Sequence, residues 1–553
     1  MNRYIFLLIA AFGFSISGYT QKNSSNTLEH QTLNQPKLVV GIVVDQMRFD
    51  YLTRYYHRYG EGGFKRLMNE GFHFKNNHFN YIPTFTGPGH ASVYTGTYPA
   101  VHGVVANDWY DKEIKASVYC VQDDEVNSIG TTHNAGKMSP HRMKTTSITD
   151  QLRLHTQQQA KVIGISLKDR GSILPAGHTG TAYWFHGKDE GRWISSSYYM
   201  SELPQWVKNF NNSGKSQHYL NQVWTPMYPI ETYTASGPDN NPFEEVFKGK
   251  ETPTFPYNLK ELSKVNGGYD FIMETVFGNS ITTDFALAAV KGENLGKNNT
   301  TDFLAISYSS PDYIGHTFGP NSVEVEDNYL QLDKELERFF NYLDKEIGQG
   351  EYLVFLTSDH GVTHIPGYLQ SLNIPAGYFN RSEFRDDLKA FSMATFKVDV
   401  IESDQSNQVF LNKEVMRNAK LDPNTVQQTL ADFLISYPKI DRVFTRNQLE
   451  SGSFNRDLGY LVQNGFNQKR SGDLVYVLQT SVLSTWYERG GTSHGSGFTY
   501  DTHVPLIFYG HGIKKGHTYQ KYEITDIAPT LSALLGIARP NGATGRVLTE
   551  LFE

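Results

Sequence analysis

The chain has 553 residues, of which 39% are hydrophobic, so it is long enough to bury a large core as one α/β domain with insertions or as two domains. This composition excludes an intrinsically disordered protein. The formal net charge is −7 and no long basic run is present, which argues against a nucleic-acid partner and means that any anion site must be built from local groups.

Residues 1–20 have the pattern of a secretory signal peptide, with Arg3 followed by a short apolar run over 4–14. That run is too short to span a bilayer, and no later stretch is long and apolar enough to do so. Cys120 is the only cysteine, so no intramolecular disulfide and no lipid-carrying cysteine near the signal peptide is possible. We therefore expect a soluble protein of the bacterial periplasm or exterior, beginning with a flexible leader over 21–36.

Residues 38–44 form a continuous β-branched run, which predicts a parallel strand covered on both faces and ending at Asp45. A helix is predicted over 62–71. Thr86 then stands directly before Gly87-Pro88-Gly89 and a run that can begin a helix. The positive end of a helix favours an anion, so a phosphate or sulfate can be held against this hydroxyl. An ordinary helix N-cap is the alternative interpretation.

A helix over 147–154 and a strand over 161–167 follow, and the strand leads into Lys168 and Arg170. In extended chain these two cations share a face. Residues 171 to about 275 differ from the preceding sequence because they contain patterns typical of loops and many aromatic residues. We interpret them as an insertion or cap. Its aromatic side chains favour packing over ligand stacking.

Periodic structure returns with a helix over 281–290 and a strand over 303–308, after which come Asp312 and His316. A long amphipathic helix is predicted over 323–347. The strand over 352–356 then leads into Asp359 and His360.

A second insertion is predicted over about 362–480, with a helix over 425–436 and a strand over 473–479, and it contains no recognisable motif. The core resumes with a glycine-rich stretch around His494. A strand over 504–509 and a helix over 524–535 complete it.

These patterns predict an α/β fold, with a mostly parallel sheet flanked by helices on both faces, as one catalytic domain over 37–553 that carries the two insertions. In open α/β sheets ligands bind beyond the carboxyl ends of the strands, and Asp45, Lys168, Asp312 and Asp359 each follow a predicted strand. Three converging carboxylates would repel one another, so two divalent metal ions are expected among them.

The spacing indicates how two such sites can form. Asp312 and His316 are four residues apart, which suits one face of a helical turn, and His494 can complete the first site. Asp359 and His360 can form a second site with Asp45. The Thr86 oxygen can occupy its open position, where a metal would make the hydroxyl a nucleophile near neutral pH. Mixed imidazole and carboxylate ligands favour zinc, with manganese as an alternative.

Each of these residues also has a structural interpretation on its own. Asp-His-Gly is a common turn, His494 can be a loop residue, and Asp45 can cap a helix. Lys168 and Arg170 can form a solvated charge group with Asp169. Five other histidines lack a supporting position and are interpreted as structural: His90, His102, His364, His503 and His511.

Taken together, the motifs resemble the alkaline phosphatase superfamily, and most closely its secreted, phosphate-irrepressible bacterial alkaline phosphatases that use threonine. The resemblance extends from about residue 37 to the C-terminus and is weak in the two insertions. The segments that carry it are the strand ending in Asp45, Thr86-Gly-Pro-Gly-His, Asn107 with its neighbours, Lys168-Asp-Arg170-Gly, Asp312-x-x-x-His316, Asp359-His360-Gly and Thr-Ser-His494-Gly.

The resemblance implies a role for each matched residue. One zinc would be held by Asp312, His316 and His494, and the other by Asp45, Asp359 and His360, with Thr86 as the nucleophile that takes the phosphoryl group before phosphate is released. Asn107, Lys168 and Arg170 would hold the non-bridging phosphoryl oxygens. The implied substrates are small phosphate monoesters, and we expect a monomer without a membrane anchor.

Related activities remain as alternatives. A phosphodiesterase or nucleotide pyrophosphatase would share the metals, but two cations at Lys168 and Arg170 favour the monoester dianion. A sulfatase would need cysteine or serine where this chain has Thr86. A cofactor-independent phosphoglycerate mutase does not fit an exported protein. A secreted binding protein without catalysis is the alternative from another functional class.

Overall fold

The computed structural model describes residues 35–188, 191–484 and 490–552, and from Gln35 onward the chain forms one compact unit. The signal peptide predicted over 1–20 and nearly all of the leader predicted over 21–36 lie outside the described residues. Among the residues described, no helix combines the length and apolar character that crossing a membrane requires.

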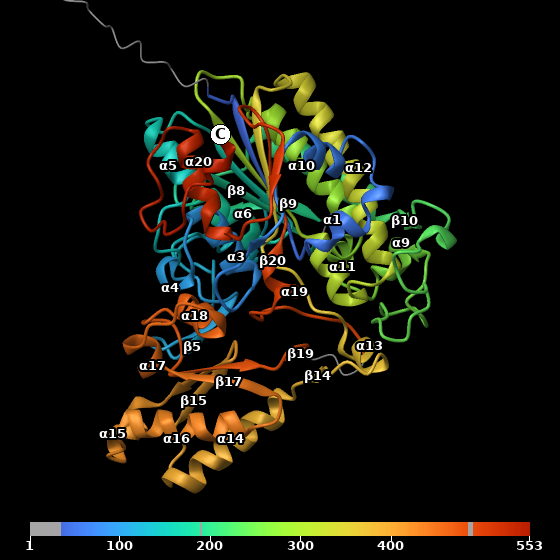
Figure 1. The fold of residues 1–553 in the computed structure, drawn as a ribbon. Helices are drawn as coiled ribbons and strands as arrows, with labels where there is room; N and C mark the ends of the chain where they lie inside the picture. The colour runs from blue at the N-terminus through green and yellow to red at the C-terminus, as the bar shows by residue number, and fades with distance from the viewer. Residues whose placement is uncertain (1–34, 189–190, 485–489, 553) are drawn as a thin grey trace, which may run out of the picture. The chain divides into compact units, whose positions relative to one another are not determined.

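A ten-stranded mixed sheet is the centre of the described structure (Figure 1). Its strand β1 (Leu38–Val44) pairs in parallel with β12 (Asp302–Tyr308) on one side and with β13 (Tyr352–Thr357) on the other. Beyond β12 the parallel order continues through β7 (Val162–Ser166) to β8 (Thr181–His186). The outer strands are β9 (Arg192–Ser196) and β6 (Ser128–Ile129) at one edge, and β21 (Leu506–Gly510), β2 (Phe72–Phe74) and β22 (Gly516–Thr518) at the other.

Strand β1 is apolar throughout because both of its faces are covered. All seven of its residues are buried. Val40 and Ile42 belong to one core cluster, whereas Val39 and Val43 belong to another, since successive side chains of a strand point to opposite faces. Each such side chain contributes about 1.5–3 kcal/mol when fully buried, so a polar residue in this run would be strongly unfavourable.

Helices cover both faces of the sheet, as Figure 1 shows. One face is covered by α10 (Phe277–Gly292) and α12 (Val323–Glu346). The other is covered by α3 (Thr86–Thr95), α5 (Ile148–His155) and α20 (Ile527–Leu534). The α/β fold with helices on both faces of the sheet, predicted from the sequence, is confirmed.

The first predicted insertion differs from the structure at its start. Helix α6 (Asp169–Ala176) and strands β8 and β9, which lie largely within 171–275, belong to the core of the fold. This stretch is rich in aromatic residues because its side chains pack against α10, a helix that covers the sheet. The Trp193 ring, for example, stacks on Phe285 with centroids 4.0 Å apart. The part of 171–275 that lies outside the central sheet therefore begins only after Ser196.

The second predicted insertion, over 362–480, contains a four-stranded antiparallel sheet with its own apolar core. The helix expected over 425–436 is α16 (Pro423–Ser436), and the strand expected over 473–479 is β18 (Leu474–Leu478). The remaining strands are β15 (Ile401–Gln405), β16 (Gln408–Leu411) and β17 (Ile440–Thr445), with α14 (Arg381–Phe396) beside them.

Candidate functional site

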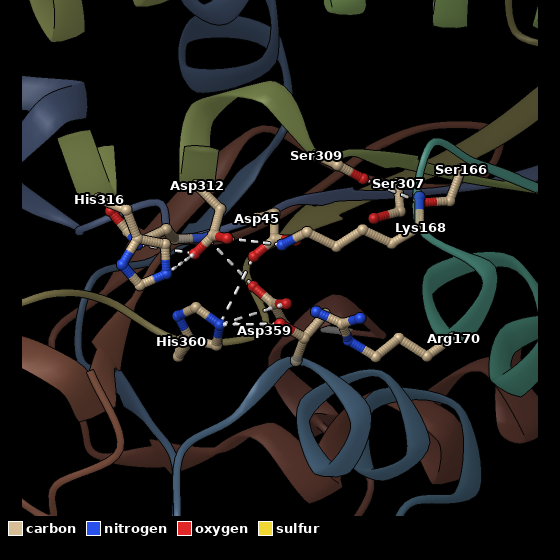
Figure 2. Close-up of polar contacts among 12 residues, drawn as sticks. Asp45, Ser166, Lys168, Arg170, Ser307, Ser309, Asp312, His316, Asp359 and His360 are labelled. Atoms are coloured by element: carbon tan, nitrogen blue, oxygen red, sulfur yellow. Dashed lines mark hydrogen bonds and ion pairs between the residues drawn. The ribbon is translucent and has the colours of Figure 1, made fainter. Parts of the chain in front are cut away.

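Four charged side chains stand just beyond the carboxyl ends of four neighbouring parallel strands. The strand order β13-β1-β12-β7 brings these ends together. Asp45 directly follows β1, Asp359 follows β13, Lys168 follows β7, and Asp312 lies in α11 (Ser310–Phe318), which begins after β12. Figure 2 shows the four side chains meeting at one point, which is where ligands bind in sheets of this kind.

Asp312, His316 and His494 form one group of facing donor atoms. Because α11 is helical here, Nε2 of His316 lies 3.2 Å from Oδ1 of Asp312, and Nε2 of His494 lies 3.6 Å from the same oxygen. Each imidazole places its Nδ1 at 2.7 Å from a backbone carbonyl, that of Thr492 for His316 and that of Thr84 for His494. A carbonyl only accepts, so Nδ1 donates, and in the neutral ring Nε2 keeps a lone pair toward the site. Despite burial, Asp312 raises the pKa of His316, so a cation at Nε2 would take the place of a proton there.

A second group lies around His360. Its Nε2 is 3.5 Å from Oδ1 of Asp45 and 3.6 Å from Oδ2 of Asp359. The hydroxyl of Thr86 lies 3.5 Å from the same nitrogen. The His360 ring is fully buried and stacks on His494 with centroids 3.4 Å apart, so the two groups are in contact. Burial lowers the pKa of His360 to about 3, which keeps its imidazole neutral, as a metal ligand must be.

Thr86 is the first residue of helix α3. The next amide, of Gly87, donates a 2.7 Å hydrogen bond to Oδ1 of Asn107, which fixes the side chain of Asn107 beside the helix start. Gly89 allows α3 to approach the loop after β13, since a Cβ at this position would come within 2.4 Å of the Asp359 carbonyl oxygen. The close approach of backbone that the glycines predict therefore brings the start of α3 next to the loop that carries Asp359 and His360.

Lys168 provides positive charge among the carboxylates. Its Nζ lies 2.6 Å from Oδ2 of Asp45 and 2.6 Å from Oδ2 of Asp312. Burial opposes its charge, but the two carboxylates outweigh burial and raise the pKa of Lys168. The pKa of Asp312 is lowered despite burial, by His316 and Lys168, whereas burial and neighbouring carboxylates raise the pKa of Asp45 and of Asp359. The expectation that positive charge must lie among these groups is thus met in part by Lys168 itself.

Arg170 extends toward the same cluster (Figure 2), but from a helix. The prediction that Lys168 and Arg170 share one face of extended chain is wrong, because α6 begins at Asp169 and the Asp169 side chain accepts from the Arg170 amide at 2.6 Å. Nη1 of Arg170 donates to the Tyr119 hydroxyl at 3.0 Å. Its Nε is buried without a hydrogen-bond partner, so this donor remains for an anion in the site.

The donor atoms fit divalent cations. Two sets of ligand atoms lie within 4.8 Å of one another: those of Asp312, His316 and His494, and those of Asp45, Asp312 and His360. Oδ1 of Asp45 and Oδ2 of Asp359 are buried without a hydrogen-bond partner, a costly arrangement for carboxylates unless a cation is held there. Asp312 belongs to both sets, whereas the sequence predicted Asp359 beside Asp45 and His360 in the second.

Gln46, which no sequence motif indicated, takes part in this site. Its backbone has a positive φ of 64°, and its Nε2 donates to Oδ1 of Asp312 at 2.7 Å. Its backbone amide donates to Oδ1 of Asp359 at 3.2 Å. Gln46 therefore orients two carboxylates, and only its position next to Asp45 could have indicated this.

His90, interpreted from the sequence as structural, also lies at the site. Its Nδ1 is 2.9 Å from the carbonyl of Thr86, and its Nε2 is 2.9 Å from the Ser307 hydroxyl. Burial lowers its pKa to about 4, so the ring is neutral. Its position four residues after Thr86, one helical turn, is a signal that could have predicted this contact.

A family model described as type I phosphodiesterase / nucleotide pyrophosphatase matches residues 39–501. Alkaline phosphatase PhoV of Synechococcus elongatus is 45% identical over 526 residues, which cover 95% of this chain and 94% of that protein. A protein of Myroides odoratus named calcium-transporting ATPase is 45% identical over 530 residues, with 95% and 96% covered.

Alkaline phosphatase PafA of Elizabethkingia meningoseptica is 45% identical over 523 residues, which cover 94% of this chain and 95% of PafA. A crystal structure of alkaline phosphatase PafA matches this fold with a TM-score of 0.90 at 44% identity, covering 94% of this chain and 99% of that one. The similarity therefore extends over nearly the full length of both proteins.

Proposed function

Because this chain belongs to the type I phosphodiesterase / nucleotide pyrophosphatase family of the alkaline phosphatase superfamily, we propose that it is a metal-dependent alkaline phosphatase that hydrolyses phosphate monoesters. The observation that carries the proposal is the Thr86 hydroxyl at the start of a helix, beside a cluster of three carboxylates and three imidazoles. The full-length similarity to PhoV and PafA supports it.

Two groups of side chains would hold the metal ions. Asp312, His316 and His494 would hold one, and Asp45, Asp359 and His360 the other, with zinc as the preferred ion for mixed nitrogen and oxygen ligands and manganese as the alternative. When bound, such ions lower the pKa of a hydroxyl and stabilise charge on the oxygens of a transferred phosphoryl group.

The reaction has two steps at Thr86. In the first, the Thr86 oxygen attacks phosphorus in line, the Oγ1–P bond forms, and the bond to the leaving-group oxygen breaks with its electron pair; that oxygen gains a proton as Thr86 loses one. In the second, water attacks phosphorus, the Oγ1–P bond breaks, and the hydroxyl is restored as phosphate departs. Asn107, Lys168 and Arg170 hold the non-bridging oxygens during both steps.

A monoester fits better than a diester because of the two cations. A monoester presents a dianionic phosphoryl group, whereas a diester has one negative charge and a second substituent. Lys168 and the unpaired Nε of Arg170 are buried, and charge-assisted hydrogen bonds at buried sites are the strong ones. The terminal phosphoryl group of ATP is also dianionic. The proposed preference is therefore compatible with ATP hydrolysis, the activity in the name of the Myroides odoratus relative.

Turnover of phenyl phosphate and of its methyl diester tests the proposal. We expect the monoester to be hydrolysed at least about tenfold faster, and Lys168→Ala to slow the monoester more than the diester, because the variant removes a cation that matches the second negative charge. Equal or faster turnover of the diester would instead indicate a phosphodiesterase.

A metal control belongs to the same experiment. Turnover should disappear with a chelator and return with Zn²⁺. A protein that binds either ester without releasing product at any metal concentration would instead be a binding protein. We further propose that the enzyme works in the bacterial periplasm or outside the cell, on the basis of the signal-peptide pattern in residues 1–20. We also propose that it works as a monomer, because the sequence has no long exposed heptad pattern that would indicate assembly.

A further inference from the structure

A second cluster of buried carboxylates lies away from the proposed catalytic residues. Glu324 lies in the first turn of α12 and has no exposed surface, and Glu244, in the segment between β10 (Val223–Trp224) and β11 (Tyr257–Asn258), is only 6% exposed. The loop that carries Glu244 packs beside Glu324, since the ring of Phe247 lies 5.5 Å from the ring of Tyr257, whose hydroxyl contacts Glu324. The negative charge of Glu324 also acts on Glu244. Neither group takes part in the proposed reaction.

The oxygens of this pair lack donors. Oε1 of Glu324 accepts from the Tyr257 hydroxyl at 2.6 Å. Its Oε2 and both carboxylate oxygens of Glu244 are buried and have no hydrogen-bond partner. Buried carboxylates are normally hydrogen-bonded, paired with a cation or bound to a metal, so three unpaired oxygens at one place call for a ligand.

Among the residues that the structure describes, the main charges acting on the pair are other carboxylates. Asp239 adds negative charge near both groups, and Asp327 does so near Glu324. The nearby ammonium of Lys250 lies over the Tyr257 ring, 4.6 Å from its centroid, and donates to the Pro256 carbonyl at 3.0 Å. Burial and the charge of Glu324 raise the pKa of Glu244 to about 10, so without a cation this group would have to retain a proton at neutral pH.

We propose that Glu244 and Glu324 bind a divalent cation, and that this cation is calcium. The unpaired atoms of both side chains are carboxylate oxygens, and calcium prefers oxygen ligands, six to eight in number, with waters and backbone carbonyls completing the set. Zinc favours sites that include imidazole or thiolate ligands, and the largest charge interactions of the two glutamates come from other carboxylates.

The position of the cluster indicates what the cation does. The Glu245 amide donates to the Thr317 carbonyl at 3.0 Å, next to His316 in α11. A Cβ at Gly490 would come within 3.0 Å of the Glu244 backbone, so the segment leading to His494 packs on the same loop. A cation held by Glu244 and Glu324 would therefore fix the loop against which both His316 and His494 are placed.

Terbium luminescence tests the site directly, because Tb³⁺ occupies calcium sites and is excited through nearby aromatic rings. Trp224 and Tyr257 lie 5.3 Å apart, and the Tyr257 hydroxyl contacts Glu324. With zinc-loaded protein in metal-depleted buffer, we expect excitation of these rings to give Tb³⁺ emission that Ca²⁺ removes by competition. Glu244→Gln should weaken Tb³⁺ binding at least about tenfold, whereas Glu251→Gln, at an exposed position in the same loop region, should not.

Thermal unfolding provides the second measurement and shows that the variant folds. Without calcium, Glu244→Gln should unfold at or above the temperature of the parent protein, since glutamine has nearly the shape of the protonated glutamate and needs no proton uptake to become neutral. Saturating Ca²⁺ should raise the unfolding temperature of the parent protein by about 2 °C or more and leave that of Glu244→Gln unchanged. Equal Tb³⁺ emission in both proteins, emission that Ca²⁺ does not displace, or no calcium-dependent shift in the parent protein would each overturn the proposal.

Discussion

At the scale of single residues, the proposed function depends on the Thr86 hydroxyl. Its oxygen contacts Nε2 of His360 at 3.5 Å and is buried with the rest of its helix turn. Valine has nearly the same shape as threonine but replaces the hydroxyl with a methyl group, so it removes the nucleophile with little change in packing.

We expect Thr86→Val to reduce turnover of a phosphate monoester by at least about 1,000-fold, because no other hydroxyl replaces the bond to phosphorus. Thr95→Val is the matched control: Thr95 lies in the same helix, and its hydroxyl donates to the Ala91 carbonyl at 2.7 Å rather than facing the site. Steady-state rates and thermal unfolding of both variants separate a catalytic loss from a folding defect. Unchanged turnover in Thr86→Val would contradict the mechanism.

At the scale of elements, the short helix α4 (Pro99–His102) ends in the buried His102, which contacts α3. Nδ1 of His102 accepts from the Val104 amide at 3.1 Å, and its Nε2 lies 3.0 Å from the Ser92 hydroxyl in α3. The ring is therefore neutral, and burial lowers the pKa of His102 from 6.5 to about 3.

The sign of the pH dependence follows from this shift. Between pH 6.5 and pH 3 the unfolded chain binds a proton at His102 that the folded chain does not, so the free energy of unfolding falls as the pH falls through this window, by up to about 1.4 kcal/mol per pH unit. His102→Asn removes this group, so the free energy of unfolding should fall less steeply between pH 6.5 and pH 5. The slope should be smaller by the equivalent of about one bound proton. Denaturant unfolding at several pH values measures this, with exposed His57→Asn as the control; an identical slope in His102→Asn and the parent protein would refute it.

At the scale of the whole molecule, the second insertion supports the segment that carries Asn107. The Tyr110 hydroxyl donates to Glu402 in β15 at 2.9 Å, and Nη1 of Arg470 donates to the Arg142 carbonyl at 2.7 Å and also to the Gly103 carbonyl. Burial lowers the pKa of Arg470 to about 10, which reflects how far this guanidinium is removed from water.

Arg470→Met should lower the free energy of unfolding by about 1–3 kcal/mol, because the side chain keeps much of its apolar length but two backbone carbonyls lose their donor. Arg442→Met, at a side chain that is 59% exposed, should change it by less than about 0.5 kcal/mol. Urea unfolding midpoints compare the two variants. A loss in Arg470→Met no larger than in Arg442→Met would show that this contact does not stabilise the fold.

The sequence alone determined the parts of this protein that depend on local pattern. The apolar run of β1 indicated a strand buried on both faces, the spacing of Asp312 and His316 indicated one helical face, and the residues at the ends of the strands indicated a shared site. Local patterns are set by side-chain period and backbone preference, which act over a few residues.

Only the tertiary structure decided which partners these residues have. It placed β8 and β9 in the central sheet, directed Lys168 between Asp45 and Asp312, and brought Gln46 and His90 to the site. Apart from the contact of His90 with Thr86, these contacts join residues that are 123 to 266 positions apart, and they depend on strand order and on the packing of one element against another. No period or spacing within a single segment encodes that order, because it arises from the burial of all the elements together.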